Sequence, residues 1–470
     1  MSWASLTRTS SKYLVALAFA AIYAAIGLMR HAHFGSNAYD LGIFDQMVWH
    51  LSRFETPAST IHGLANMFGD HFSPIHVFYV PLSWLWPSAS SLIATQAIAF
   101  GLSIVPVWIF LERKLPQRAA ALMAIAYGCF WGLQRAAQFD VHELAFAPLL
   151  IALALLSLDR ILSVERATSA HVVFGLSLAL LCFVKEDQIP LVVAICGLWA
   201  LRAPSVRERI TAASLAVAAL GVFVLIVRVV IPALNDGGAW AVGSAFGDVQ
   251  SDPLSLFSRL VSPAVKLKTL SMWLLPFALL PLASPYGLLL VPLVLERFLS
   301  ASPNHWGTSF HYTAPLAPIL AMAAGDALAR WRQHATPIAS ICLLLSAVLP
   351  GHEPMWKLLS PSFYTAPPFA TTAARALTHI PPQASVVAQS AIVPHLSRRQ
   401  DIYMMRAEGA CAGVDADFVI AAAGDLPPWP FIAADQVRAQ LAMYLQRGYA
   451  TVFQENGWVV LARGGAEPQR

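Results

Sequence analysis

The sequence predicts a polytopic α-helical membrane protein with a small α/β domain at its C-terminal end. Of the 470 residues, 57% are hydrophobic, and the mean hydropathy is +0.60. Only 12% are charged, whereas soluble globular chains carry roughly 25%. Long apolar runs fill residues 1–350, but residues 351–470 alternate short helical and strand-like patterns. These observations indicate that most of the chain faces lipid or a protein core and that the tail faces water.

Apolar runs long enough to cross a bilayer, or nearly so, predict about eleven transmembrane helices. The first run follows Arg8 and Lys12, and we expect it to be retained as a transmembrane helix because no small-residue cleavage site closes it. The runs are 13–29, 91–111, 118–133, 143–158, 170–184, 187–201, 210–232, 269–283, 286–299, 312–329 and 335–350.

The distribution of basic loops predicts the topology. Short loops rich in Lys and Arg favour the cytoplasm; here they are residues 112–118, 159–166, 202–209 and 330–334. All four fall inside only if the aromatic, Pro-bounded segment 73–87 lies at the outer interface instead of spanning. We therefore expect a multi-pass protein of the bacterial inner (cytoplasmic) membrane with outer-face juxtamembrane helices. Its N-terminus is expected in the cytoplasm and its C-terminal domain in the periplasm.

The tail, residues 351–470, predicts an extracytoplasmic α/β domain. A helical pattern covers 371–379 and another covers 433–447, with strand-like segments between them at 385–389, 402–405 and 417–423. A hairpin follows, ATVFQ-ENG-WVVLA, in which Asn456-Gly457 supplies the turn.

Charge and cysteine usage exclude several classes of protein. The net charge is only +4 and no Lys/Arg-rich run occurs, so we expect no nucleic-acid partner. Four of the five cysteines lie in apolar runs, Cys411 stands alone in the tail, and no pair has metal-site or disulfide-framework spacing. No nucleophile elbow, Walker loop or dinucleotide fingerprint is present.

Acidic and histidine residues gather in the expected outer loops. In the first loop, Asp40 precedes a helical pattern over 43–54 that contains Asp45; Asp40 is a candidate base or metal ligand, and a simple helix cap is the alternative. Asp70 and His71 follow, just before Ser73-Pro74. Adjacent residues of an extended segment point opposite ways, so the two serve different partners or one of them is structural. His71 is a candidate functional residue, although a loop His is often only solvated.

Two further clusters lie where apolar runs meet. Asp140, His142 and Glu143 occur within four positions and are of metal-ligand type, although the spacing of Asp140 and Glu143 also resembles a capping box. Ionisable residues at membrane depth are costly and usually functional. Lys185, Glu186 and Asp187 join two runs; either Lys185 holds a phosphate while a carboxylate orients it, or the three neutralise one another.

The last cluster lies in LERFLSASPNHWGTSFHYTAP. Arg297 on the outer side opposes the positive-inside bias, so we predict that it contacts phosphate. His305, His311 and Tyr312 are candidate substrate contacts in the same segment.

Several separated motifs resemble a known family. YDLGIFDQ, GDHFSPI, FDVHELAFAPLL and VKEDQIPL occur in that order, followed by the polar segment HYTAPLAP and, in the tail, AQSAIVPHLSRRQDIY. Together they resemble the bacterial predicted-membrane-protein family called domain of unknown function 2079. The layout is also similar to that of the GT-C superfamily of glycosyltransferases, in which a first span is followed by a long outer loop bearing an acid.

The resemblance implies residue roles. Asp40 matches the first-loop acid, the catalytic base or a metal ligand, and Asp140 matches the second-loop acid, so both are predicted to be catalytic. The segment 71–74 occupies the place of a motif that borders the donor site. The chain departs from the pattern because Leu follows the Tyr-Asp pair where a second acid is usual, and because His142 and Glu143 are additional.

The resemblance also implies a function. We expect transfer of a sugar from a polyprenyl-phosphate-linked donor to an acceptor at the outer face of the membrane, with the lipid bilayer and that donor as partners. A divalent cation, Mg²⁺ or Mn²⁺, is the candidate cofactor. The alternative is a transporter or flippase, which would place its ionisable groups midway along helices, often in inverted repeats. The predicted metal ligands are Asp40, Asp70, Asp140, His142 and Glu143, and the predicted substrate contacts are Asp45, His71, Lys185, Glu186, Asp187, Arg297, His305, His311 and Tyr312.

Overall fold

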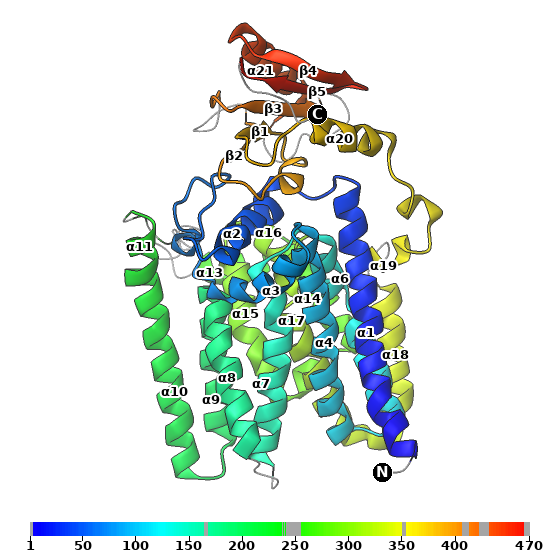
Figure 1. The fold of residues 1–470 in the computed structure, drawn as a ribbon. Helices are drawn as coiled ribbons and strands as arrows, with labels where there is room; N and C mark the ends of the chain where they lie inside the picture. Colours follow the sequence, from blue (N-terminus) through cyan, green and yellow to red (C-terminus); the bar gives the residue numbers. More distant parts are fainter. Residues whose placement is uncertain are drawn as a thin grey trace.

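The fold is a bundle of helices that stand side by side, with a small sheet-containing domain on one end (Figure 1). The computed structural model describes residues 3–163, 168–236, 238, 240, 255–349, 354–406, 413–422 and 432–464. The first helix, α1 (Trp3–Ala32), begins at the end of the bundle opposite to the C-terminal domain and reaches the domain at its own C-terminus. We call the end beneath the C-terminal domain the outer end.

Each predicted apolar run contains helix. Within the described residues, four helical stretches are individually long and apolar enough to cross a membrane, namely Ser10–Ala32, Ser90–Lys114, Glu143–Leu162 and Val206–Leu234. The other runs form shorter helices, so the number of eleven spans stays a prediction. The bundle helices after α1 are α4 (Ser90–Lys114), α5 (Gln117–Gly128), α7 (Ala147–Leu162), α8 (Thr168–Val184), α9 (Ile189–Arg202), α10 (Val206–Leu225), α14 (Val265–Leu274), α15 (Leu290–Leu299), α17 (Leu316–Leu328) and α18 (Ala335–Val348).

Small residues let the central helices approach closely. A Cβ atom on Gly101 of α4 would lie 2.6 Å from the carbonyl oxygen of Ala16, so α1 and α4 touch backbone to backbone there. Nearly all of α17 is buried among its neighbours. By contrast α10 is apolar but largely exposed, with Val217 71% accessible. An apolar helix without a protein partner on most of its surface is typical of a lipid-facing helix.

Two predicted segments differ from a continuous helix. The run 269–283 is broken after α14 by η8 (Leu275–Phe277) and η9 (Leu280–Ala283), and Ala278 and Leu279 between them have positive φ values of 51° and 59°. Prolines in both short helices cannot donate helical hydrogen bonds, which explains the break. Segment 73–87 forms only η3 (Pro74–Tyr79) and α3 (Val80–Leu85), too short to span, as the interfacial interpretation requires.

Short elements join the helices. At the outer end they include α2 and α16, which Figure 1 shows beneath the C-terminal domain. Besides those already given, the short elements of the described residues are η1 (Ala38–Gly42), α2 (Ile43–Ser52), η2 (Met67–Gly69), α6 (Trp131–Gln138), η4 (Glu143–Phe146), η5 (Glu186–Gln188), η6 (Ile226–Val230), α11 (Ile231–Leu234), α13 (Ser255–Val261), η10 (Pro285–Leu289), α16 (Pro303–Trp306), η11 (His311–Thr313), η12 (Ala329–His334), α19 (Pro354–Lys357), η13 (Pro361–Phe363) and η14 (Val393–His395).

The C-terminal domain contains a five-stranded sheet in the order β2-β1-β3-β5-β4. Strand β1 pairs in parallel with β2 and β3, and the remaining pairs are antiparallel. Asn456 and Gly457 both have positive φ, 46° and 81°, so the predicted hairpin turn is confirmed. Every predicted strand and helix of the tail is present, as β1 (Val386–Ala388), β2 (Ile402–Met404), β3 (Phe418–Ala422), β4 (Ala450–Glu455), β5 (Trp458–Ala462), α20 (Pro368–Thr378) and α21 (Ala434–Gln446).

The sheet has two buried faces. One packs against α21 through Val437, Leu441 and Tyr444. The other face belongs to the same apolar core as the membrane helices. There Phe34, just after α1, meets Trp458 of β5 with ring centroids 5.8 Å apart. The domain is therefore held firmly over the outer end.

Candidate functional site

A chain of charged side chains runs through the outer end, from a partly exposed carboxylate to a buried ammonium group. Asp40 Oδ1 lies 3.2 Å from His142 Nε2 in a hydrogen bond. His142 Nδ1 forms an ion pair with Glu143 Oε2 at 2.8 Å, and Glu143 Oε1 forms another with Lys185 Nζ at 2.9 Å. Four residues that the sequence singled out, from three separate loops, thus meet in one line of contacts.

Asp40 is held in an unusual backbone conformation. It lies in the kinked turn η1 with φ 75° and ψ −85°, close to the strained γ-turn region. Such a conformation in a non-glycine residue costs about 1–3 kcal/mol and is often found at functional sites. The Asp40 side chain is 25% exposed, whereas that of His142 is 9% exposed and that of Glu143 is fully buried. Of these three side chains, Asp40 is therefore the one that an incoming molecule can reach.

His142 is fixed between the two carboxylates. Tyr79 Oη donates to its backbone carbonyl at 3.0 Å, and its ring stacks on that of His311 with centroids 3.5 Å apart. Burial would lower the pKa of His142, but the carboxylates of Glu143 and Asp40 outweigh burial and raise the pKa to about 9. The imidazole is consequently a cation at neutral pH.

Asp140 lies near Asp40, but its carboxylate oxygens already accept hydrogen bonds from other residues. Arg30 Nη1 contacts its Oδ1 at 2.5 Å, and the backbone N–H of Asn37 donates to its Oδ2 at 3.1 Å. Its side chain is 1% exposed. Burial, followed by the nearby Asp40 charge, raises the pKa of Asp140 despite Arg30. The geometry assigns Asp140 to fixing the end of α1 and the start of the Asp40 loop.

Two buried cations, Lys185 and Arg297, belong to the site. Burial would lower the pKa of Lys185, but Glu143, Asp187 and Glu186 raise it well above its usual value, so the ammonium stays charged. The guanidinium of Arg297 lies 5.5 Å from the ring centre of Trp273, and its side chain is buried. Within the described ranges, no carboxylate lies within ion-pair distance of Arg297. This arginine is thus available to an anion.

Aromatic and imidazole rings surround these cations. The ring centroid of Tyr312 lies 5.9 Å from Cζ of Arg297 and 4.9 Å from the ring centroid of His305. His311 is buried, and neither of its ring nitrogens has a hydrogen-bond partner among the described residues. Burial and the charge of His142 lower the pKa of His311 well below its usual value. The neutral ring leaves nitrogen atoms for a bound molecule.

His71 and Glu186 form a neighbouring pair. Glu186 Oε1 lies 2.8 Å from His71 Nδ1 and accepts from Trp240 Nε1 at 2.7 Å, while its Oε2 accepts from the backbone N–H of Phe72. Asp187 lies 3.7 Å from Lys185. These contacts tie the 67–72 loop to the 185–188 turn, so Glu186 orients its neighbours and His71 is the more exposed partner.

Two predicted residues lie apart from the cluster. Asp45 is completely buried and holds Arg398 at 2.8 Å, with Ser397 donating to the same carboxylate at 2.7 Å. It is a link to the C-terminal domain where we expected a substrate contact. Asp70 is half-buried, with its nearest cationic partner His62 at 3.6 Å, and it makes no contact with the other expected metal ligands.

The side chains predicted to bind a divalent cation are paired with other side chains of the protein. In the part of the chain that the structure describes, no group of three or more His, Cys, Asp or Glu residues could hold a metal ion. The reason lies in the donors: Asp140 is paired with Arg30, and Glu143 with Lys185 and His142. Carboxylates already neutralised by protein cations are poor ligands for Mg²⁺ or Mn²⁺. We derive no chemical step from a metal.

Sequence reasoning missed several partners. Arg30 was overlooked although it lies at the outer end of the first span, the same departure from the positive-inside bias that singled out Arg297. Trp240 and Asn37 carried no comparable signal. Arg406, from the C-terminal domain, donates to Tyr39 Oη next to Asp40. This contact joins elements more than 360 residues apart, and no local pattern indicates it.

Comparisons with known proteins agree with this architecture. The family model described as "Predicted membrane protein (DUF2079)" matches residues 30–460. The fold is similar to that of ArnT from Cupriavidus metallidurans bound to undecaprenyl phosphate, with 13% identity, 96% of this chain and 97% of that chain covered, and a TM-score of 0.56. For the apo state of the same protein, the identity is 14%, 98% of each chain is covered, and the TM-score is 0.53. No curated protein sequence matches. The expected resemblance to the DUF2079 family is thus confirmed, and the expected helical fold with a small C-terminal sheet is similar to that of ArnT over nearly the whole chain.

Proposed function

The chain belongs to the DUF2079 family of predicted membrane proteins, and we propose that it is a glycosyltransferase that moves a sugar from a polyprenyl-phosphate-linked donor to an acceptor at the outer face of the membrane. The observation that carries this proposal is the line of contacts from Asp40 to Lys185, in a fold similar to that of ArnT. It places an accessible carboxylate and buried cations at the same helix ends.

Sugar transfer needs a base and a place for the departing phosphate. Asp40 would accept the proton of the acceptor hydroxyl as its oxygen attacks the anomeric carbon of the sugar. The bond from that carbon to the phosphate oxygen breaks, and polyprenyl phosphate leaves as an anion. Arg297 and Lys185 would stabilise the negative charge that develops there. His142, as an imidazolium, orients Asp40 through their hydrogen bond.

An apolar cavity beside Arg297 supports a lipid-linked donor. Its volume is about 340 Å³, and its walls include Trp273 and Phe298, whose rings stack with centroids 5.4 Å apart. The Trp273 ring that borders the cavity also carries the guanidinium of Arg297. A lipid phosphate at Arg297 could therefore send its isoprenoid chain along this wall. The other lining residues are aliphatic apart from Gly287, and they come from α13, α14, α15, η9 and η10.

The proposal is tested by following the departing lipid. Purified protein in nanodiscs would be given a panel of polyprenyl-phosphate sugars and a cell-envelope acceptor fraction, and release of polyprenyl phosphate would be measured. We expect release by the wild type and its loss, by at least 100-fold, in Asp40→Asn, as for removal of a general base. Asp70→Asn is the matched control because Asp70 lies outside the cluster. Full release by Asp40→Asn would remove the proposed role.

The same assay distinguishes a glycosyltransferase from the alternative, a transporter or flippase. That function moves the lipid-linked sugar intact, so no polyprenyl phosphate is released. The site residues lie at helix ends: most are in η1, η4, η5 and η11 or next to them, and Arg297 is in the last turn of α15. A transporter site is instead expected midway across the bilayer.

A further inference from the structure

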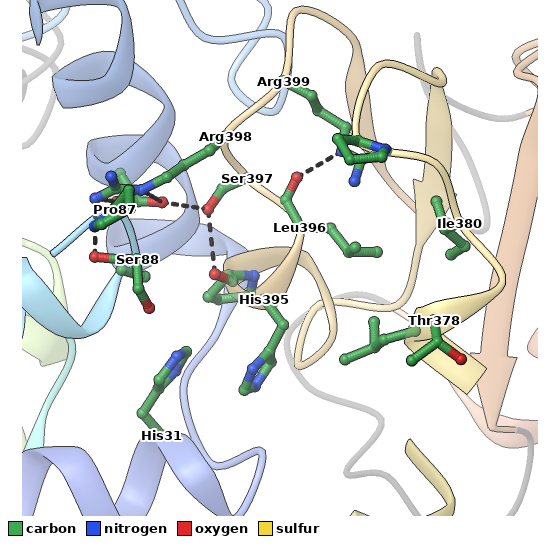
Figure 2. Close-up of a pocket in the computed structure, with 15 residues that line it drawn as sticks. His31, Pro87, Ser88, Thr378, Ile380, His395, Leu396, Ser397, Arg398 and Arg399 are labelled. Carbon is green, nitrogen blue, oxygen red and sulfur yellow. Dashed lines mark hydrogen bonds and ion pairs between the residues drawn. The ribbon is translucent and has the colours of Figure 1, made fainter. Parts of the chain in front are cut away.

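A second cavity lies between the C-terminal domain and the outer end of the bundle (Figure 2). Its volume is about 400 Å³, which is within the range of small-molecule sites. The helical bundle contributes His31 of α1, and its outer end contributes Asp45 of α2 and the 87–89 loop. The C-terminal domain contributes residues between Leu377 and Arg399. None of the side chains in the line from Asp40 to Lys185 borders it. The proposed transfer reaction therefore leaves this cavity without a role.

The lining carries an excess of positive charge. Arg398 is neutralised by Asp45, which also accepts from Ser397. Arg399 is 5% exposed, and among the described residues its guanidinium donates only to the backbone carbonyls of Leu396, Pro381 and Ala384, at 2.7–3.2 Å. No carboxylate lies within ion-pair distance of Arg399 among the described residues. An uncompensated buried cation is unfavourable, and an anion in the cavity would compensate it.

Two histidines supply further polar groups. His31 and His395 stack with ring centroids 4.2 Å apart and an interplanar angle of 7°, and Figure 2 shows the two rings side by side. His31 Nδ1 is bonded to Ser36 Oγ at 2.6 Å. The buried Nε2 of His395 has no hydrogen-bond partner among the described residues. Burial, followed by the His31 charge, lowers the pKa of His395 well below its usual value, so its ring is neutral and can donate or accept one further hydrogen bond.

The position of the cavity points to the membrane surface. Its 87–89 wall directly follows Trp84 and Trp86, which are 56% and 42% exposed. Exposed tryptophans mark the level of the lipid headgroups. At that level the commonest anionic group is phosphate, and arginine is the side chain best suited to bind it.

We propose that this cavity binds a phosphate group, with Arg399 as its cation and His395 as a hydrogen-bond partner. Ser88 and Thr378 border the same space and offer hydroxyl groups. The phosphate belongs either to a lipid headgroup of the outer leaflet or to a soluble phosphorylated molecule. This site is independent of the donor site at Arg297, and the proposal stands whether or not the protein transfers sugar.

The test measures binding in non-ionic detergent micelles, by the shift in thermal unfolding and by calorimetric titration. One arm adds inorganic phosphate and the other adds phosphatidylglycerol. Arg399→Gln removes the cation. Thr378→Glu places a carboxylate at the rim and leaves the carbonyl contacts of Arg399 intact, so it remains informative if Arg399→Gln does not fold. Arg375→Gln is the matched control. Arg375 is an exposed arginine of α20, the helix that also contains Thr378; it pairs with Glu455 and lies outside the cavity lining.

We expect saturable binding to the wild type and to Arg375→Gln, weakened at least ten-fold in Thr378→Glu and in folded Arg399→Gln. Binding of inorganic phosphate alone assigns a soluble ligand. Binding of phosphatidylglycerol alone, or of both in competition, assigns a lipid headgroup. The proposal is overturned if neither compound binds the wild type, or if Thr378→Glu binds them as tightly as the wild type does.

Discussion

Removing Glu143 should destabilise the protein more than any other single change at the candidate site. Its carboxylate is fully buried and lies 2.8 Å from His142 and 2.9 Å from Lys185. In Glu143→Gln the shape is kept, but both cations lose their shared counter-charge. Breaking a buried ion pair by removing one partner costs about 3–5 kcal/mol, a large part of the roughly 5–15 kcal/mol that stabilises a typical protein.

A double-mutant cycle with Lys185→Met measures the interaction energy between Glu143 and Lys185. That single change leaves Glu143 with His142 as its remaining cation, so we expect a loss of about 2–4 kcal/mol, somewhat below the value for a carboxylate with no partner. Because the two residues interact directly, the double variant should lose about 1–3 kcal/mol less than the sum of the two single variants.

The free energy of unfolding would be measured by titration with SDS in mixed micelles, followed by tryptophan fluorescence. Asp70→Asn serves as the control because Asp70 is half-buried and outside the cluster; it should cost less than about 1 kcal/mol. Losses below about 1 kcal/mol for Glu143→Gln, or strict additivity in the cycle, would show that the buried charges do not depend on one another.

The remaining predictions concern the backbone, pH and the domain contact. Asp40→Gly should stabilise the protein by about 1 kcal/mol by relieving the positive φ, yet abolish release of polyprenyl phosphate; unfolding titration and the release assay on the same sample check both effects. Because the pKa of His142 is raised to about 9, its contribution to stability should be complete below pH ~6.5 and should disappear as pH rises through 9. Unfolding measured from pH 6 to 10 should show this decline in the wild type but not in His142→Phe. Asp45→Asn leaves Arg398 buried without its counter-charge and should cost about 3–5 kcal/mol. Limited proteolysis should then release the C-terminal domain faster than in Asp70→Asn.

Local patterns predicted much of this molecule because its local interactions and its tertiary structure agree. The hairpin of the tail is an example: Asn456-Gly457 suits a turn with two positive φ values, and strands β4 and β5 pair on either side of it. The concentration of acids and imidazoles at one end was likewise visible, since charged residues avoid the apolar runs and gather where the runs stop. That rule places Asp40, His142 and Lys185 at the same level, and the structure connects them: Asp40 contacts His142, and Glu143 joins His142 to Lys185.

The pairing of those charges could not be predicted. Whether a carboxylate meets a substrate or an arginine depends on tertiary contacts, such as Asp45 with Arg398 across 353 positions or Asp140 with Arg30 across 110. The sequence places Asp40 and Asp45 in the same outer loop and predicts that both face the site. In the structure, the first turn of α2 directs Asp45 toward the C-terminal domain, while the kink in η1 directs Asp40 toward His142.

The difference between Asp40 and Asp140 follows from how many of their acceptor sites remain available. A carboxylate can accept about four hydrogen bonds. Asp140 accepts from Arg30 at both oxygens and from both nitrogen donors of Asn37, and it is almost completely buried. Asp40 has one hydrogen bond to His142 and a side chain that is one quarter exposed. A base must reach the hydroxyl from which it takes a proton, and only the carboxylate of Asp40 meets that requirement. Asp140 instead holds Arg30 and Asn37 in place, which fixes the end of α1 and the backbone three residues before Asp40.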